Sequence, residues 1–331
     1  MIEVLEQPVD DDGRRALREQ VSTRRVIVVT GSGGVGKTTS AAALGLFGAR
    51  LGRRTLVITI DPARRLANAL GLTALSHVPQ RIDGAISAVD GRPVQGDLFA
   101  MMLDIKAAWD DMLRRTAPDQ QTAEKILANR FYGTLSRDLP GAHEFIACEC
   151  LHHLTSSGDW DLVVLDTPPT SNALDFLEAP ARILAVLDNE AFRYFAQRKQ
   201  SLGLRFLDAS LVQGAAGRAQ SVLARLTGAE VLEELGDFIV LLRDLYEPLT
   251  KRTRALQEML RGESTRFLVV TSPAAPSLAE ARLLIAELKE RGLPLGALVV
   301  NRVTPTAGRA VSLLADARWH DHLKNAGLSP A

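Results

Sequence analysis

The sequence predicts an α/β fold built on a doubly wound, mostly parallel sheet, and two observations lead to this prediction. Short runs of β-branched and leucine residues recur along the chain, as expected for strands that are covered on both faces. The first run, Val26–Thr30, leads into a glycine-rich loop and then into an alanine-rich helical stretch. Strand, loop and helix in this order begin the right-handed crossover unit from which such sheets are built.

Five runs share the buried-strand character and are predicted to be parallel strands: 26–30, 55–60, 162–166, 266–271 and 295–301. Helices are predicted over 38–51 and over 277–291. The second of these is expected to begin at the N-cap Ser277, with Glu280 completing a capping box, and to end at Gly292.

The remaining segments define the expected domain organisation. Residues 1–24 are highly charged, with one weak helical stretch around residues 14–21, and are predicted to be a flexible N-terminal arm, followed by a single domain over 25–331. Two stretches, about 92–158 and 176–262, have helical rather than strand periodicity. We expect them to form a helical subdomain inserted into the α/β domain.

Composition excludes several classes of protein. Lys+Arg and Asp+Glu both number 39, so no overall field attracts the chain to nucleic acid, and no nucleic-acid partner is expected. No apolar run reaches the ~18 residues that a membrane span requires, and the N-terminus is acidic, unlike a signal sequence. Cys148 and Cys150 are the only cysteines, which argues against a disulfide framework. These features predict a cytoplasmic protein.

The glycine-rich loop matches the phosphate-binding pattern G-x-x-x-x-G-K-[ST] in the required place between a strand and a helix. Glycines let backbone N–H groups turn toward phosphate oxygens, and the helix N-terminus adds its positive end. Lys37 is expected to reach the β/γ-phosphates, and the Thr38 hydroxyl is expected to ligate Mg²⁺. The predicted nucleotide-binding residues of the loop are Gly31, Ser32, Gly33, Gly34, Val35, Gly36, Lys37, Thr38 and Thr39.

Two aspartates end predicted strands at the same edge of the sheet as the loop. Asp166 follows the run Leu162–Leu165 and is expected to hold Mg²⁺ through water. Asp61 follows the strand over 55–60 and could accept a hydrogen bond from the attacking water. Either aspartate could instead cap a following helix, a common role for this residue at a strand end.

The identity of the base can also be predicted. Folds of this kind that bind GTP usually carry N-K-x-D after a late strand, and its carboxylate accepts from guanine. Here the strand is followed by Asn301-Arg-Val-Thr, with no carboxylate in the fourth place. Asn301 can both donate and accept, which suits adenine, so ATP is favoured over GTP.

These residues resemble the arsenite-pump (ArsA) and tail-anchored-protein targeting (Get) ATPases, and in particular their bacterial anion-transporting branch. The resemblance covers most of residues 25–303, with motifs in matching order and spacing. They are GSGGVGKTT at 31–39, IDPARRLANALG at 60–71, DTPPTSNALDFLEAP at 166–180, and SLAEARLLIAEL followed by ALVVNRV, which ends at residue 303.

The resemblance implies a P-loop NTPase of the deviant Walker A (SIMIBI) type that works as a dimer with two facing nucleotides. Asp61 would lie in the first switch and position water, residues 166–170 would form the second switch, and Asn301 would contact adenine. Helices above the switches would open and close with the nucleotide state to hold and release a cargo.

One departure from the family pattern concerns Ser32, which stands where the family has a lysine that reaches the partner's phosphates. A charge supplied in this way is worth about 10³- to 10⁵-fold in rate. A homodimer of this chain could therefore hydrolyse ATP slowly. Alternatively, the chain could be a nucleotide-binding regulatory subunit that pairs with a lysine-bearing paralogous ATPase, or an arginine such as Arg64 or Arg65 could substitute.

Two further departures concern metal and cargo. Cys148, Cys150, His152 and His153 supply too few convergent soft ligands for a closed zinc or arsenite site, so neither is expected. Membrane-anchor binders favour methionine-rich grooves, whereas residues 178–262 hold only Met259. Their leucine and valine stripe could be ordinary core or a groove for a hydrophobic or membrane-protein cargo. The expected function is that of a cytoplasmic Mg²⁺-dependent ATPase.

Overall fold

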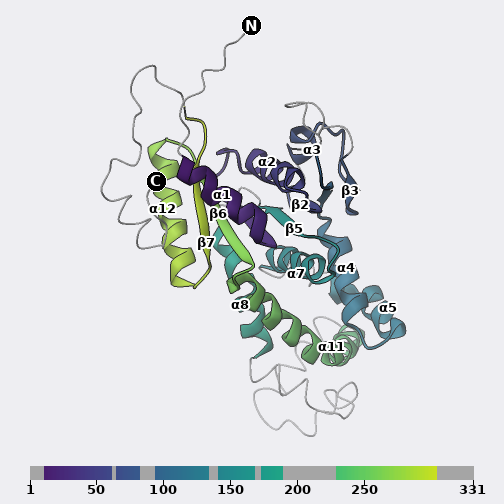
Figure 1. The fold of residues 1–331 in the computed structure, drawn as a ribbon. Helices are drawn as coiled ribbons and strands as arrows, with labels where there is room; N and C mark the ends of the chain where they lie inside the picture. Colours follow the sequence, from purple (N-terminus) through teal and green to yellow (C-terminus); the bar gives the residue numbers. More distant parts are fainter. Residues whose placement is uncertain are drawn as a thin grey trace. The chain divides into compact units, whose positions relative to one another are not determined.

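The computed structural model describes residues 11–61, 65–82, 94–133, 141–167, 173–188 and 229–303. The chain forms two compact units (Figure 1). The first consists of Met1–Asp104, Leu151–Leu177 and Glu258–Ala331, and the second of Ile105–Cys150 and Glu178–Gln257. None of the described helices is both long enough and apolar enough to cross a bilayer.

The first unit is built around a seven-stranded sheet with the strand order β3-β4-β2-β5-β1-β6-β7. All five predicted strands are present and parallel to their neighbours. Their bounds are β1 Val26–Thr30, β2 Thr55–Thr59, β5 Leu162–Asp166, β6 Thr265–Thr271 and β7 Leu295–Val300. The fold class predicted from the sequence is therefore observed.

The structure adds two strands that the sequence analysis did not predict. β4 (Leu98–Met102) pairs parallel to β2, and the short β3 (Gln80–Arg81) pairs antiparallel to β4. β4 falls in the stretch that was expected to be helical. Its sequence, LFAMM, consists largely of good helix formers, so its strand conformation follows from pairing with β2 rather than from local propensity.

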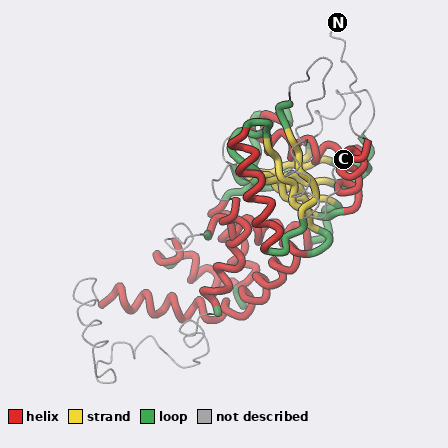
Figure 2. The backbone as a smooth tube through the Cα atoms, turned by 90° about the vertical axis from the view of Figure 1, so that its left-hand side faces the viewer, coloured by secondary structure: helices red, strands yellow, loops and turns green. Residues whose placement is uncertain are grey.

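Helices cover the sheet on both faces. α2 (Lys37–Arg50) connects β1 to β2, whereas α12 (Ala275–Glu290) connects β6 to β7 in the opposite direction along the sheet. Because both connections are right-handed, the two helices lie on opposite faces. Figure 1 shows α12 running beside β6 and β7, and Figure 2 shows the strands gathered with helices on either side.

Close packing of α2 on the sheet depends on two glycines. A Cβ at Gly45 would lie 2.2 Å from Val57 Cγ2, and one at Gly48 would lie 2.7 Å from Leu162 Cδ2. Any larger residue would push the helix away from β2 and β5. The start of α2 is therefore held at a set distance from the end of β1.

The start of α12 differs from the prediction. The helix begins at Ala275, and its N-cap is Ala274, with a proline in the first turn. Ser277 consequently lies inside the helix and does not cap it. The fixed φ of Pro276 suits a helical first turn and determines the start in place of the expected capping box.

The N-terminal region also differs from the prediction. Residues 11–23, placed in a flexible arm, form α1 (Asp11–Thr23), and its Val21 is completely buried in the core. Arg53 Nη1 donates to the carbonyl oxygens of Val21 and Arg24 at 2.5 and 2.6 Å. The buried Val21 and the contacts from Arg53 attach this helix to the rest of the first unit. The charged composition of the helix did not reveal this attachment. Residues 1–10 lie outside the described residues.

The described part of the second unit is helical. Its elements are α4 (Ile105–Thr116), α5 (Gln120–Ala128) and parts of α7 (Ala142–Ser156), α8 (Ala173–Leu187) and α11 (Ala229–Arg261). Trp109 packs on Phe145 with ring centroids 5.8 Å apart, and Phe131 packs on Phe238 at 6.2 Å. The second unit covers 105–150 and 178–257, which is narrower than the predicted helical subdomain over about 92–158 and 176–262. Residues 134–140 and 189–228 lie outside the described residues.

Candidate functional site

The strand register brings the predicted site residues to one edge of the sheet. Asp166, the last residue of β5, is level with Val29 of β1 on one side and with Thr59 of β2 on the other. β1 ends at Thr30, the residue after Val29, and the phosphate loop begins at Gly31. On the other side, Asp61 lies two residues after Thr59. Parallel strands end at the same edge, which is where open α/β sheets place their ligand sites.

The loop has the backbone conformation that anion binding requires. Gly31, Gly34 and Gly36 have φ values of 150°, 74° and 102°, which side-chain-bearing residues rarely adopt. Gly36 is the N-cap of α2, and no described side chain caps this helix. The amides of its first turn are therefore available to an anion, and the helix dipole favours one there.

Two loop glycines are also required by their neighbours. A Cβ at Gly31 would lie 2.0 Å from the Val270 carbonyl oxygen, and one at Gly36 would lie 2.1 Å from Asn301 Nδ2. The first contact is with backbone and cannot yield. By contrast, Gly34 has nothing within 4 Å of such an atom, so only its backbone conformation requires glycine.

Lys37 is buried, with 6% of its surface exposed, and its ammonium group is turned into the loop. Nζ donates to the carbonyl oxygens of Gly31 at 2.9 Å and Ser32 at 2.8 Å. Burial lowers the pKa of Lys37, while the negative charge of Asp166 acts in the opposite direction. A desolvated cation beside uncapped amides is well suited to a phosphate.

Asp166 is 1% exposed and has one satisfied oxygen. Oδ2 accepts from the Thr59 hydroxyl at 3.0 Å, whereas Oδ1 is buried and has no hydrogen-bond partner among the described residues. Burial raises the pKa of Asp166, partly offset by the Thr38 and Thr59 hydroxyls and by Lys37. An unsatisfied carboxylate oxygen near a threonine hydroxyl fits a hard cation or its water ligand.

Ser32 presents a second unsatisfied atom. Its hydroxyl is buried and has no hydrogen-bond partner among the described residues. A hydroxyl can donate to a phosphate oxygen but carries no charge. Of the other loop residues, Val35 packs in the core at 2% exposure, while Gly33 and Thr39 are exposed.

Asp61 is held by an arginine. Arg65 Nη1 lies 3.3 Å from Asp61 Oδ2, and the Asp61 amide donates to Thr59 Oγ1 at 3.2 Å. The Asp61 side chain is 13% exposed and that of Arg65 is 58% exposed. Residues 62–64, including Arg64, and residues 168–170 of the expected second switch lie outside the described residues.

Asn301 lies against the phosphate loop. Its Nδ2 donates to the Val35 carbonyl oxygen at 2.9 Å, and its backbone N–H donates to the Thr271 carbonyl oxygen at 2.8 Å. The side chain thus braces the loop near Gly36, a role that the sequence analysis did not predict. Its predicted contact with adenine stays a prediction.

Thr59 and the pairing of Arg65 with Asp61 were not predicted from the sequence. Thr59 links both aspartates, because its hydroxyl donates to Asp166 and accepts from the Asp61 amide. A polar residue at the end of an otherwise apolar strand was the available signal. The Arg65 pairing follows from i,i+4 spacing at the beginning of α3 (Arg65–Ala69).

Comparison with known proteins identifies the family. The family profile described as "Anion-transporting ATPase" (ArsA) matches residues 24–324, which is most of the chain. The chain belongs to this family. Its members are ATPases with the P-loop NTPase fold of the SIMIBI class, in agreement with the sheet and loop described above.

Individual relatives are more distant. An uncharacterized protein of Streptomyces coelicolor is 29% identical over 296 residues, covering 88% of this chain and 65% of that protein. The ATPase GET3B of Arabidopsis thaliana is 26% identical over 307 residues, with 85% and 65% covered. The ATPase get3 of Aspergillus terreus is 27% identical over 285 residues, with 85% and 74% covered. The chain spans just under two thirds of the length of the first two relatives.

The cysteine region offers little reactivity. Cys148 is fully buried in α7, and burial raises its thiol pKa well above the usual value. Burial and the charge of Glu149 raise the pKa of Cys150 to about 12. Within the described residues, no group of three or more His, Cys, Asp or Glu side chains could hold a metal ion. The absence of zinc and arsenite sites from the whole chain stays a prediction.

Proposed function

We propose that this ArsA-family chain is a Mg²⁺-dependent ATPase whose site lies at the loop between β1 and α2. The observation that carries the proposal is the pair of buried charges at this loop. Lys37 and Asp166 are both desolvated, and Asp166 Oδ1 lacks a described partner. Buried charges of this kind are costly to the folded protein unless a ligand completes their interactions.

The proposed roles follow from chemistry. The amides around Gly36 and the Lys37 ammonium bind the β- and γ-phosphates, and Asn301 contacts adenine. Bound Mg²⁺ would be held by Thr38 directly and by Asp166 through water, and it would supply positive charge at the β- and γ-phosphate oxygens. Asp61 orients a water molecule toward the γ-phosphorus.

In the proposed reaction, the water oxygen forms a bond to the γ-phosphorus while the bond to the β,γ-bridging oxygen breaks. That bond's electron pair leaves with ADP. Asp61 accepts a hydrogen bond from the water, and the released proton passes to the phosphate product or to solvent. ATP and water are thereby converted to ADP and inorganic phosphate, with atoms and charge balanced.

We extend the proposal to the second unit and to assembly. The resemblance to dimeric targeting ATPases supports a cytoplasmic homodimer, or a heterodimer with a paralogous ATPase, in which nucleotide state alters how the helices hold a hydrophobic or membrane-protein cargo. The neutral Ser32 supports the alternative of a regulatory subunit that binds nucleotide without hydrolysing it alone.

Turnover and binding by purified protein distinguish these functions. Asp61→Asn should retain ATP binding in calorimetry but lower kcat by about 10²- to 10⁴-fold, the usual worth of a positioned acid or base. Asp97→Asn is the matched control, because Asp97 also pairs with an arginine, Arg81 at 2.7 Å, in an exposed position. Its kcat should be unchanged.

Other outcomes have distinct meanings. Equal turnover by Asp61→Asn and wild type would remove Asp61 from the mechanism. Binding of ATP by the wild type without turnover, followed by activity on adding a lysine-bearing paralogue, would support the regulatory subunit. No binding of Mg²⁺-ATP by folded wild-type protein would refute the proposed function.

A further inference from the structure

The Asp61–Arg65 pair joins a shielded side chain to an exposed one. The Asp61 side chain is 13% exposed, while the Arg65 side chain is 58% exposed. Arg65 Nη1 lies 3.3 Å from Asp61 Oδ2, which is longer than the ~2.7–2.9 Å of a good charge-assisted hydrogen bond. A half-exposed arginine at this distance from a carboxylate four residues away is weakly held and can turn to a better acceptor.

The arginine is also linked to the phosphate site through hydrogen bonds. Arg65 contacts Asp61, whose backbone amide donates to Thr59 Oγ1 at 3.2 Å. The Thr59 hydroxyl donates in turn to Asp166 Oδ2 at 3.0 Å, so Arg65 lies at the same edge of the sheet as the phosphate loop. In the loop itself, over residues 31–39, Ser32 supplies a neutral hydroxyl and Lys37 is the one cationic residue.

We propose that Arg65 is a second phosphate-binding cation, supplied by the same chain, that exchanges partners when a triphosphate binds. Without a γ-phosphate, Arg65 holds Asp61. With one, Arg65 turns to the γ-phosphate and releases the Asp61 carboxylate to orient water. This inference rests on the proposed ATPase function and deepens it, because it assigns recognition of the terminal phosphate to Arg65.

The direction of the exchange follows from the strengths of the two contacts. Planar guanidinium groups bind phosphate through two parallel, charge-assisted hydrogen bonds, and the phosphate carries more charge than a single carboxylate. By contrast, the contact with Asp61 is 3.3 Å long and partly exposed to solvent. Since ADP lacks the γ-phosphate, ADP leaves Arg65 on Asp61.

The test compares equilibrium binding of Mg²⁺-AMPPNP, a nonhydrolysable triphosphate, with that of Mg²⁺-ADP by calorimetry. Arg65→Ala should weaken AMPPNP binding by about 10- to 100-fold, the usual worth of a charge-assisted hydrogen bond, and should change ADP binding less than about twofold. Arg65→Lys should recover part of the AMPPNP affinity. Arg81→Ala, which removes an arginine of similar exposure from its pair with Asp97, should leave both affinities unchanged.

A double-mutant cycle tests the exchange itself. Removing the competing carboxylate with Asp61→Asn should tighten AMPPNP binding more in the Arg65 background than in the Arg65→Ala background. A merely structural role for Arg65 would not produce this difference. Equal gains in the two backgrounds would overturn the exchange.

The two hypotheses fail differently. An unchanged ratio of AMPPNP to ADP affinity in folded Arg65→Ala would overturn the role of Arg65 while leaving the ATPase proposal intact. Binding of both nucleotides by the wild type without turnover would refute ATPase activity of the isolated chain, and the affinity ratio would still decide the role of Arg65. A wild type that binds neither nucleotide would overturn both.

Discussion

Lys37 and Asp166 each carry a charge that the fold has removed from water. Burial shifts both pKa values toward the neutral form, downward for Lys37 and upward for Asp166. At a pH below its lowered pKa, the protonated Lys37 therefore decreases the free energy of unfolding. This decrease shrinks as the pH rises through the lowered pKa and is gone above the usual value of 10.5. The burial of these two charged groups is therefore better explained by the binding of a ligand than by a contribution to the stability of the fold.

The cost of Asp166 can be measured. The pKa of Asp166 is 3.8 in the unfolded chain and higher in the folded protein, so the folded protein binds more protons between these two pKa values. The free energy of unfolding therefore falls as the pH rises from 3.8 through the folded pKa. Asp166→Asn removes the charge and should raise the free energy of unfolding at pH 7 by about 1–3 kcal/mol, less what is lost in attraction to Lys37. Urea unfolding at pH 7 and near pH 4 measures this.

The gain should shrink as the pH falls, because the raised pKa of Asp166 lets the folded wild-type carboxyl take up a proton before the unfolded chain does. Asp97→Asn, at an exposed ion pair, serves as the control and should change stability by less than about 1 kcal/mol. A destabilised Asp166→Asn variant at pH 7 would mean that the ionised carboxylate is compensated in the folded protein without a ligand.

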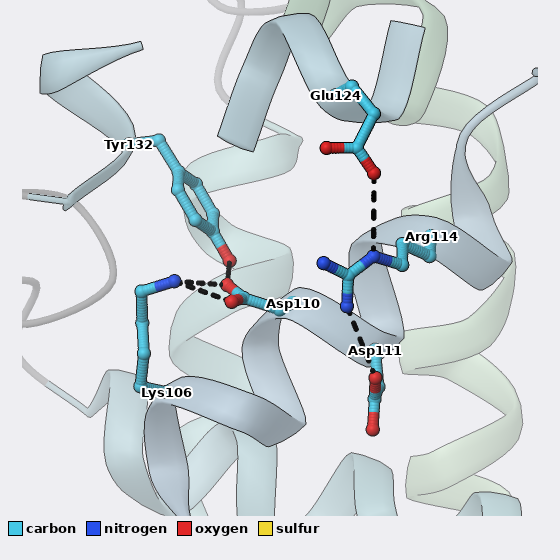
Figure 3. Close-up of polar contacts among 6 residues, drawn as sticks. All are labelled: Lys106, Asp110, Asp111, Arg114, Glu124 and Tyr132. Atoms are coloured by element: carbon cyan, nitrogen blue, oxygen red, sulfur yellow. Dashed lines mark hydrogen bonds and ion pairs between the residues drawn. The ribbon is translucent and has the colours of Figure 1, made fainter. Parts of the chain in front are cut away.

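At the scale of elements, one buried acid links three helices of the second unit. Glu149 of α7 is 2% exposed and pairs with Arg115 of α4 at 3.1 Å and with Arg252 of α11. The pair of contacts joins three helices that are far apart in sequence. An exposed counterpart lies nearby in sequence, where Arg114 contacts Asp111 at 3.5 Å and Glu124 at 3.7 Å (Figure 3).

These two arginine–carboxylate sites should respond very differently to truncation. Glu149→Ala leaves two partly buried guanidinium groups without their carboxylate and should lower the free energy of unfolding by about 3–5 kcal/mol. Glu124→Ala, in the exposed cluster of Figure 3, should cost less than about 1 kcal/mol. Chemical denaturation followed by circular dichroism checks both. Similar losses in the two variants would show that Glu149 is not the link between these helices.

At the scale of the whole molecule, ligand binding should appear as stability. A ligand at 100 times its Kd adds about 2.7 kcal/mol to the folded state, and each kcal/mol shifts Tm by roughly 2–4 °C in a domain of this size class. Mg²⁺-AMPPNP should therefore raise the Tm of the wild type by several degrees in calorimetry.

Lys37→Ala is the matched control for this shift, since it removes the buried ammonium that donates to the loop carbonyls. Its Tm should not respond to the nucleotide. A wild type whose Tm is equally insensitive would contradict the proposed site. A shift in both proteins would place the nucleotide elsewhere.

Much of the molecule could be predicted because its signals are local. The runs over β1, β2, β5, β6 and β7 are apolar and β-branched, and the loop pattern ending in Lys37 and Thr38 is contiguous in sequence. Asp61 and Asp166 could be assigned to one edge because parallel strands share it. By contrast, the attachment of α1 and the strand conformation of β4 depend on partners elsewhere in the chain, so their charged or helix-favouring sequences did not reveal either.

The sequence by itself determined the fold class, the family and the phosphate loop, since each depends on residues that are neighbours along the chain. Tertiary structure alone decided that Asn301 braces the loop at Val35 and that Glu149 joins two arginines. The physical reason is that hydrogen bonds and ion pairs act over a few ångströms. Which polar groups come within that reach depends on strand register and helix packing, and short sequence patterns do not encode either.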